Sequence, residues 1–253
     1  MKKFWGFLLV IVLMTSCGEY QSLLKSNDYN LVYKKAIEYY NKGDYQRAMN
    51  LLDGVRSVFV GQAKAQNIAY YRAFCSYNMK DYQIASDLFK QFIQTYPESS
   101  FAEECLYMMG FCDYKASPKP RLDQQVTEKA IREFQLYLSR YPYSMRKDKV
   151  NTYMDEMRDK LSYKAYLSAK NYYLREHYKA AVISLQNCLK DYPGSKYREE
   201  IMYMLFVSKY QMAGNSVEDK KGERYNNARE EYYYLSDEYP NSRYAADVKK
   251  MYE

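Results

Sequence analysis

The pattern Tyr-Pro-x-Ser occurs four times in this chain and uses four of its six prolines. The copies occupy residues 96–99, 141–144, 192–195 and 239–242. Proline ends a helix because it lacks the N–H group and restricts the residue before it, and serine is a good N-cap for a following helix. The pattern therefore predicts four boundaries where one helix closes and the next opens. Ser100 and Glu103 also have the spacing of a capping box.

Five similar segments come before these boundaries, beginning at residues 45, 82, 127, 178 and 225. The first segment has no Tyr-Pro and runs to Phe59-Val60. Each segment has an alanine three residues in, a large residue one turn later, and an apolar or small residue three positions beyond. These are Ala48, Ala85, Ala130, Ala181 and Ala228; Leu52, Phe89, Phe134, Leu185 and Tyr232; and Val55, Phe92, Tyr137, Cys188 and Leu235. Spacings of four and three place them on one stripe of an amphipathic helix.

A partner segment precedes the alanine helices, and residues 69–78, 106–115 and 202–211 are copies of it. Helix pairs at periods of roughly 34 to 50 residues indicate a solenoid. The tightest copy, residues 65–98, resembles a tetratricopeptide repeat, with Ala73, Tyr82, Ala85, Phe89 and Pro97 at matching offsets. We therefore expect an all-α fold, a right-handed α-solenoid of five tetratricopeptide-like helix pairs. A final helix over 244–252 would cap it through Val248 and Met251.

Two repeats carry insertions, at 116–125 and 214–222, which we expect to be loops. Residues 146–175 contain no Gly or Pro and are expected to form one long helix. The predicted organisation is a lipoprotein signal peptide at 1–16 and a lipidated tether at 17–29. Repeats 1–3 follow at 30–145, and the long helix, repeats 4–5 and the cap occupy 146–253.

The N-terminus has the features of a secretory signal. Lys2 and Lys3 precede an apolar run over 4–14, which is shorter than the roughly 20 residues of a transmembrane helix. The run ends in Met-Thr-Ser-Cys, which resembles a bacterial lipobox and makes Cys17 the expected lipidation site. No Asp follows Cys17, so we expect a lipid anchor on the periplasmic face of the outer membrane.

Charge and cysteine usage exclude several other classes of protein. The formal charge is +7, and it falls to +5 without Lys2 and Lys3. Acidic and basic residues are interspersed, which is typical of solvated helix faces and not of a nucleic-acid-binding surface. The four cysteines after Cys17 are expected to be buried thiols, and Cys75–Cys112 is the one disulfide pairing left open.

Tyrosine is unusually frequent, at 33 of 253 residues, and it recurs at two positions of the first helices, seven residues apart. The first position holds Tyr33, Tyr70, Tyr107, Tyr166 and Tyr203, and the second holds Tyr40, Tyr77, Tyr114, Tyr173 and Tyr210. Residues seven apart share one face of a helix. In the first three repeats Tyr33, Tyr40, Tyr70, Tyr77, Tyr107 and Tyr114, with Asn41 and Asn78, are predicted to line a groove that binds a peptide or partner. The alternative is that these tyrosines pack against neighbouring helices.

No catalytic or metal-binding pattern is present in the sequence. His177 is the single histidine, and there is no Gly-rich phosphate loop, G-x-S-x-G or metal-spaced His/Cys cluster. Adjacent carboxylates such as Glu103 and Glu104 point to different sides of a helix. We therefore expect a protein that is not an enzyme and has no cofactor.

The chain resembles the BamD family, the lipoproteins of the outer-membrane β-barrel assembly machinery. The resemblance is carried by residues 158–161, 172–173, 178–181 and 189–193, and by 17–26 followed by 43–45, which look like Bacteroidetes-type members. It implies that the C-terminal repeats contact the periplasmic domains of a BamA-like barrel insertase. It also implies that the N-terminal repeats meet unfolded outer-membrane proteins.

Two other classes of envelope lipoprotein remain as alternatives. A Tol-system-like adaptor would carry an N-terminal coiled coil, and residues 17–30 contain no heptads. A SusD-type nutrient-binding lipoprotein is usually about twice this length and has long glycan-binding loops.

Overall fold

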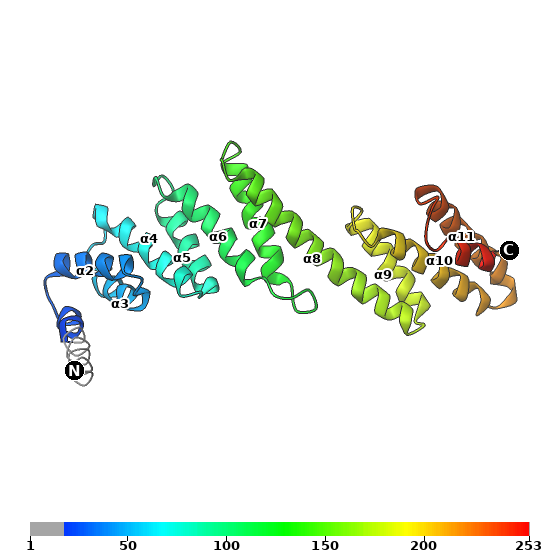
Figure 1. The fold of residues 1–253 in the computed structure, drawn as a ribbon, viewed down its shortest axis with the longest axis horizontal. Helices are drawn as coiled ribbons and strands as arrows, with labels where there is room; N and C mark the ends of the chain where they lie inside the picture. Colours follow the sequence, from blue (N-terminus) through cyan, green and yellow to red (C-terminus); the bar gives the residue numbers. More distant parts are fainter. Residues whose placement is uncertain (1–17, 253) are drawn as a thin grey trace, which may run out of the picture. The chain divides into compact units, whose positions relative to one another are not determined.

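A computed structural model describes residues 18–252, and these residues form helices and turns without a β-strand. The helices are α2 (Tyr29–Asn41), α3 (Tyr45–Val55), α4 (Ala63–Asn78), α5 (Tyr82–Thr95), α6 (Ala102–Ala116), α7 (Gln125–Arg140), α8 (Lys147–Leu174), α9 (Tyr178–Asp191), α10 (Arg198–Gly214), α11 (Glu218–Glu238) and α12 (Ala245–Tyr252). Residues 18–24 are helical as well. The prediction of an all-α chain of helix pairs is confirmed (Figure 1).

Each predicted alanine segment forms the second helix of a pair. Ala48, Ala85, Ala130 and Ala181 are fully buried, and Ala228 nearly so. The large residues that follow them are fully buried too, apart from Tyr232, which is half-buried. The apolar stripe therefore faces the partner helix. Burial of such a stripe is the main source of stability for an amphipathic helix in a protein.

The four Tyr-Pro-x-Ser boundaries lie where they were predicted, but the serine acts differently from the expectation. Helices α5, α7, α9 and α11 each end immediately before the tyrosine, and the next helix begins three residues after the serine. The serine is therefore not the N-cap. Its hydroxyl accepts a hydrogen bond from the backbone N–H two residues on, over 3.2 Å for Ser99 and Ser144, 3.3 Å for Ser195 and 3.1 Å for Ser242. The serine thus holds the short turn that leads into the helix.

The predicted capping box of Ser100 and Glu103 does not form. The N-cap of α6 is Phe101, and no side chain caps this helix. Glu103 instead accepts hydrogen bonds from the hydroxyls of Tyr137 and Ser144. Glu103 thus interacts with residues distant in the sequence and not with Ser100.

The long-helix prediction is confirmed, since α8 is a single helix of 28 residues. The insertion before α7 is a loop over 117–124, as expected. The expectation for 214–222 is corrected: only 215–217 lie between helices, and α11 already begins at Glu218. Glu218 and Asp219 lie in its first turn, where negative charge stabilises the helix N-terminus, and the helix tolerates Gly222.

The chain divides into two compact units, and the division falls within α8. The first unit contains residues up to 118 together with 125–153, and the second contains 119–124 together with the residues from 154 onward. In the first unit α2 to α7 pack consecutively. In the second, α8 shares a hydrophobic core with α9 and α10 through Ala169, Leu185 and Leu205.

Both ends of the described chain are packed against their neighbours. In α12 Val248 is buried, and Met251 packs on the same core cluster as α10 and α11, which confirms the capping helix. At the other end, the segment expected to be a tether is helical over 18–24. Tyr20 and Leu23 are buried in the core of the first pair, and the Asn50 amide donates to the Tyr20 hydroxyl over 3.0 Å.

The cysteines after Cys17 are buried free thiols, as predicted, and Cys75 and Cys112 are not bridged. Burial raises the pKa of Cys75 and Cys105 to about 12 and that of Cys188 to about 11. These groups are therefore neutral at physiological pH and behave as small apolar side chains.

Candidate functional site

The serines of the last three boundaries link one helix pair to the next. Each serine meets the residue that occupies one equivalent position of the preceding first helix. Ser144 donates to Glu103 over 2.7 Å, Ser242 donates to Glu199 over 2.8 Å, and Ser195 accepts from Ser162 over 2.8 Å. We call these three contacts the boundary bonds. They join residues 33 to 43 positions apart, so they are tertiary contacts between repeats.

The tyrosines that recur seven residues apart in the first helices form what we call the tyrosine ladder. Its first row is Tyr33, Tyr70, Tyr107, Tyr166 and Tyr203, and its second row is Tyr40, Tyr77, Tyr114, Tyr173 and Tyr210. The first row uses the same boundaries. The residue two positions after each boundary serine lies against the ladder tyrosine of the preceding helix. Ring centroids are 4.6 Å apart for Tyr70 and Phe101, 4.3 Å for Tyr166 and Tyr197, and 4.1 Å for Tyr203 and Tyr244, and the Arg146 guanidinium lies 5.0 Å from the Tyr107 ring. Aromatic and cation–π pairs of this kind contribute about 0.5–1.5 kcal/mol each. The first-row rings thus help to join consecutive repeats.

The second row also packs against aromatic neighbours. Tyr40 lies 4.9 Å from Tyr71, and Tyr114 lies 4.4 Å from Tyr153, between ring centroids. Tyr77 contacts Phe111 at 6.2 Å. These contacts again connect one first helix with the next, so the two rows form a continuous aromatic layer in the first unit.

The structure places the predicted groove residues on this aromatic layer with limited exposure. Tyr107 is buried, while Tyr33, Tyr40, Tyr70, Tyr77 and Tyr114 are half-buried. Asn41 is exposed, and the half-buried Asn78 donates to the Phe74 carbonyl over 2.8 Å. Cys17 lies outside the described residues.

The hydroxyls of Tyr40 and Tyr70 are held in the neutral form. Burial raises the pKa of Tyr40 to about 12. The pKa of Tyr70 is raised further, first by burial and then by its 2.8 Å hydrogen bond to Glu104. A ligand on this layer would therefore meet apolar ring faces and hydrogen-bond donors.

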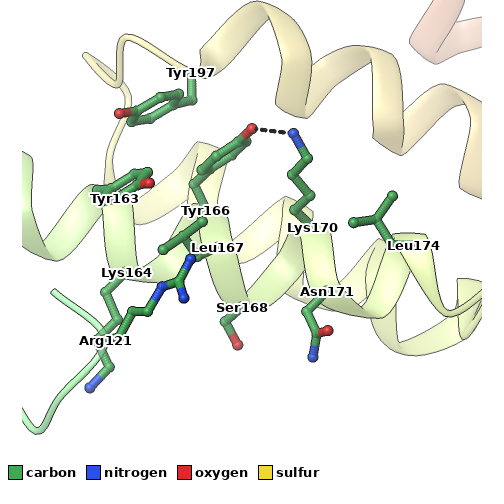
Figure 2. A pocket seen from close by; sticks show the side chains of 10 residues that line it. All are labelled: Arg121, Tyr163, Lys164, Tyr166, Leu167, Ser168, Lys170, Asn171, Leu174 and Tyr197. Carbon is green, nitrogen blue, oxygen red and sulfur yellow. Dashed lines mark hydrogen bonds between the residues drawn. The ribbon is translucent and has the colours of Figure 1, made fainter.

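A cleft that was not predicted runs along α8 in the second unit, with a volume of about 760 Å³. It is lined by Arg121, Tyr163, Lys164, Tyr166, Leu167, Ser168, Lys170, Asn171, Leu174 and Tyr197 (Figure 2). The ladder tyrosine Tyr166 belongs to it, and Lys170 donates to the Tyr166 hydroxyl over 2.8 Å. Sequence reasoning missed the cleft because Arg121 comes from the inserted loop, which no periodic pattern places against α8.

A buried polar cluster lies between α5, α6 and α7. Asp113 accepts from the Ser86 hydroxyl over 3.0 Å and forms an ion pair with Lys129 at 2.9 Å. The neighbouring Glu133 is 8% exposed, and its Oε2 atom has no hydrogen-bond partner. Among residues 18–252 no group of three or more His, Cys, Asp or Glu side chains is arranged to hold a metal ion.

Comparison with known protein families shows the family to which the chain belongs. The model of the YfiO family, described as an outer membrane lipoprotein family, matches residues 25–221 and, in a second match, residues 165–253. The chain belongs to the YfiO family. The matches extend over both units, and they confirm the resemblance to BamD-like lipoproteins expected from the sequence. As a YfiO-family protein, the chain is associated with the outer membrane.

The solved structures that are similar to this YfiO-family protein match it at low identity. A TPR repeats protein from Bacteroides fragilis is 13% identical, with a TM-score of 0.43, over 90% of this chain and 97% of that one. The TPR2AB domain of yeast Sti1 is 14% identical, with a TM-score of 0.41, over 88% and 96%. Human IFIT1 is 16% identical, with a TM-score of 0.31, over 92% and 58%. A search of curated proteins gave no significant match.

None of the helices in the described part of the chain has the length and apolar character needed to cross a membrane.

Proposed function

We propose that this protein is a lipid-anchored, non-catalytic scaffold of the outer-membrane β-barrel assembly machinery. Membership of an outer membrane lipoprotein family, matched over both units, is the observation that carries the proposal. An acylated Cys17 would hold the protein on the periplasmic face of the outer membrane. Export and anchoring would place both units where outer-membrane proteins arrive unfolded.

The two units would bind different partners. The second unit, with repeats 4 and 5, would dock the periplasmic domains of a BamA-like barrel insertase. The first unit would present the tyrosine layer around Tyr40, Tyr70 and Tyr77 to unfolded outer-membrane proteins. Half-buried rings give such a surface large, rigid contact faces at low entropic cost. Weak binding would suffice, because anchoring and docking raise the effective concentration of the substrate.

The insertase half of the proposal is tested by calorimetric titration of residues 18–253 with the soluble periplasmic domains of the same organism's insertase. We expect micromolar binding. Tyr233 and Tyr234 are 54% and 62% exposed on α11 in the second unit, so replacing both by serine should weaken binding at least tenfold if they lie in the interface. Matched controls are Ile84→Ser and Leu136→Ser, which alter similarly exposed side chains of the first unit and should leave insertase binding unchanged.

The substrate half is tested with a peptide from the C-terminal strand of an outer-membrane protein, ending in an aromatic residue. Alanine at Tyr70, Tyr77 and Tyr107 should reduce binding, whereas phenylalanine at the same positions should retain it because the ring faces remain. Thermal unfolding is followed in parallel to show that each variant remains folded. Asn41→Ala tests whether this exposed residue, which was also predicted to line the groove, takes part in peptide binding. Unchanged peptide binding in stable alanine variants would exclude the tyrosine layer as the substrate surface. A folded chain that binds no insertase domain would indicate a different envelope adaptor.

A further inference from the structure

The cleft follows α8 over several turns. Its lining residues on α8 run from Tyr163 to Leu174. They cover a broad part of the helix surface, with Tyr166 and Lys170 on one side and Ser168 on the other (Figure 2). With a rise of 1.5 Å per residue, they span roughly 17 Å of helix. An extended peptide of about five residues has the same length, because each residue of a strand adds about 3.3 Å.

One end of the cleft is built from stacked aromatic rings. Tyr166 and Tyr197 are nearly parallel, at an interplanar angle of 10° and a centroid distance of 4.3 Å, and Tyr163 lies 5.3 Å from Tyr197. Figure 2 shows these three rings together, with Leu174 at the opposite end of the row. Leu174 is 66% exposed. The cleft thus offers apolar surface at both ends.

The charge of the lining is entirely positive. Arg121, Lys164 and Lys170 line the cleft, and no carboxylate does. Lys170 is balanced by Glu200 at 2.7 Å. Within the described residues neither Arg121 nor Lys164 has a carboxylate at ion-pair distance, and the Lys164 ammonium instead donates to the Leu122 carbonyl over 2.7 Å. Two cations therefore lie beside apolar surface without counter-charges.

We propose that this cleft binds an extended segment of a partner protein in which acidic residues alternate with aromatic or aliphatic ones. Side chains alternate along an extended chain, so one set can lie on Tyr166, Tyr197 and Leu174 while the carboxylates face Arg121 and Lys164. The exposed amide of Asn171 lies between the two ends and can hydrogen-bond the peptide backbone. The inference goes beyond the scaffold function and does not depend on it, because it concerns a short linear segment and not an insertase domain.

The test uses the chain from residue 18 onward and a fluorescein-labelled pentapeptide, Phe-Asp-Leu-Asp-Phe, with its C-terminus amidated, in which both Asp side chains lie on one side of an extended chain. Fluorescence anisotropy should show saturable binding that weakens as salt rises, since the ion pairs are partly screened. The same peptide with both Asp replaced by Asn should bind about tenfold more weakly. A version with serine in place of every Leu and Phe should not bind measurably.

The protein variants are matched for charge. Arg121→Glu with Lys164→Glu should weaken peptide binding by at least about tenfold. Lys190→Glu with Lys220→Glu makes the same change in net charge on exposed surfaces of α9 and α11 and should leave binding unaltered. Lys164→Gln removes the charge but keeps a donor for Leu122, so a loss of binding in this variant cannot come from a displaced loop. Leu174→Asp, at an exposed position, should also weaken binding without unfolding the chain.

Several results would overturn the inference. One is equal binding of the Asp and Asn peptides, and another is equal loss in the two double charge reversals. A third is the absence of peptide binding together with adsorption to phosphatidylglycerol vesicles that depends on Arg121 and Lys164. That last outcome would make the cleft a lipid-headgroup surface.

Discussion

The boundary serine has a different role in the folded chain from the one that its local sequence predicts. By itself, Tyr-Pro-x-Ser describes a helix stop followed by a cap. In the folded chain the same hydroxyl receives a backbone N–H from its own turn and contacts the preceding repeat. Ser144 combines both roles, since it accepts from Arg146 and donates to Glu103. The repeated motif therefore sets the spacing of repeats as well as the ends of helices.

Replacing Ser144 by alanine should lower the free energy of unfolding by about 1–2 kcal/mol, because it removes the hydrogen bonds of this hydroxyl with Arg146, Glu103 and Tyr137. Urea denaturation followed by circular dichroism measures the change. Ser100→Ala is the control, since Ser100 is exposed and caps no helix, and it should change the stability by less than about 0.5 kcal/mol. Equal effects of the two substitutions would mean that the boundary bond is not stabilising.

Glu133 is a buried carboxyl group whose ionisation affects the stability of the fold. Burial, followed by its hydrogen bond to Asp113, raises the pKa of Glu133 to about 8 from an ordinary 4.5. Lys129 lowers the pKa of Glu133. Its ammonium group also forms ion pairs with Asp113 at 2.9 Å and with Asp87 at 3.8 Å. The folded protein therefore keeps the proton on Glu133 at pH values where the unfolded chain has released it.

The sign of the pH dependence follows from this shift. The stabilisation from protonated Glu133 is complete below about pH 4.5 and is lost progressively as the pH rises through about 8. Glu133→Gln keeps the shape and can still donate to Asp113, so the variant should lose this decline and be more stable than the parent by about 1–2 kcal/mol at pH 8. Glu128→Gln, at an exposed position of α7, should leave the pH profile of the unfolding midpoint unchanged. A parallel profile for parent and Glu133→Gln would refute the assignment.

At the scale of elements, α6 and α7 approach each other closely at Gly110. A Cβ atom on Gly110 would lie 2.8 Å from Cδ1 and 3.0 Å from Cε1 of Phe134, and Phe134 is fully buried and has no space to retreat. The equivalent positions in α4 and α8 hold Ala73 and Ala169. A small residue thus occupies this position in α4, α6 and α8.

Gly110→Ala should therefore destabilise the protein, although alanine favours helix by about 1 kcal/mol. Overpacking in a rigid core costs about 1–3 kcal/mol, and we expect a net loss of about 1 kcal/mol by urea denaturation. Gly54→Ala in α3 is the matched control, because a Cβ there meets nothing within 4 Å, and it should raise stability. If both substitutions stabilise the chain, the contact between Gly110 and Phe134 is looser than described.

For the whole molecule, repeat arrays gain their stability mainly from contacts between neighbours. The two units each have their own hydrophobic cores, with Leu51 and Leu52 in one and Leu185 and Leu205 in the other. A defect in one unit should therefore open that unit more than the other.

Amide hydrogen exchange of Gly110→Ala tests this expectation. Exchange should accelerate in α6 and α7 and in their neighbours in the first unit, while α9 to α11 keep the protection seen in the parent chain. Tyr225→Ala, at a partly exposed position of α11, should give the opposite pattern. Uniform acceleration in both units would mean that α8 makes the two units unfold together.

The helix pairs could be predicted from the sequence alone, because their signals are local and repeated. The alanine stripe marked the buried face, the prolines marked the helix ends, and the absence of Gly and Pro over 146–175 marked α8. The same local logic failed at 214–222, where acidic residues start α11 within an apparent loop, and at Ser100, where tertiary contacts replaced the expected capping box.

The contacts between side chains of different repeats could not be predicted in this way. The tyrosine rows were visible as a period of seven, but their contacts with Phe101, Arg146, Tyr197 and Tyr244 depend on the next repeat packing in register. The α8 cleft depends on Arg121 reaching it from a loop, and the raised pKa of Glu133 depends on burial beside Asp113. These properties arise from contacts between residues distant in the sequence, and a periodic pattern, which records only the helix to which a residue belongs, does not contain them.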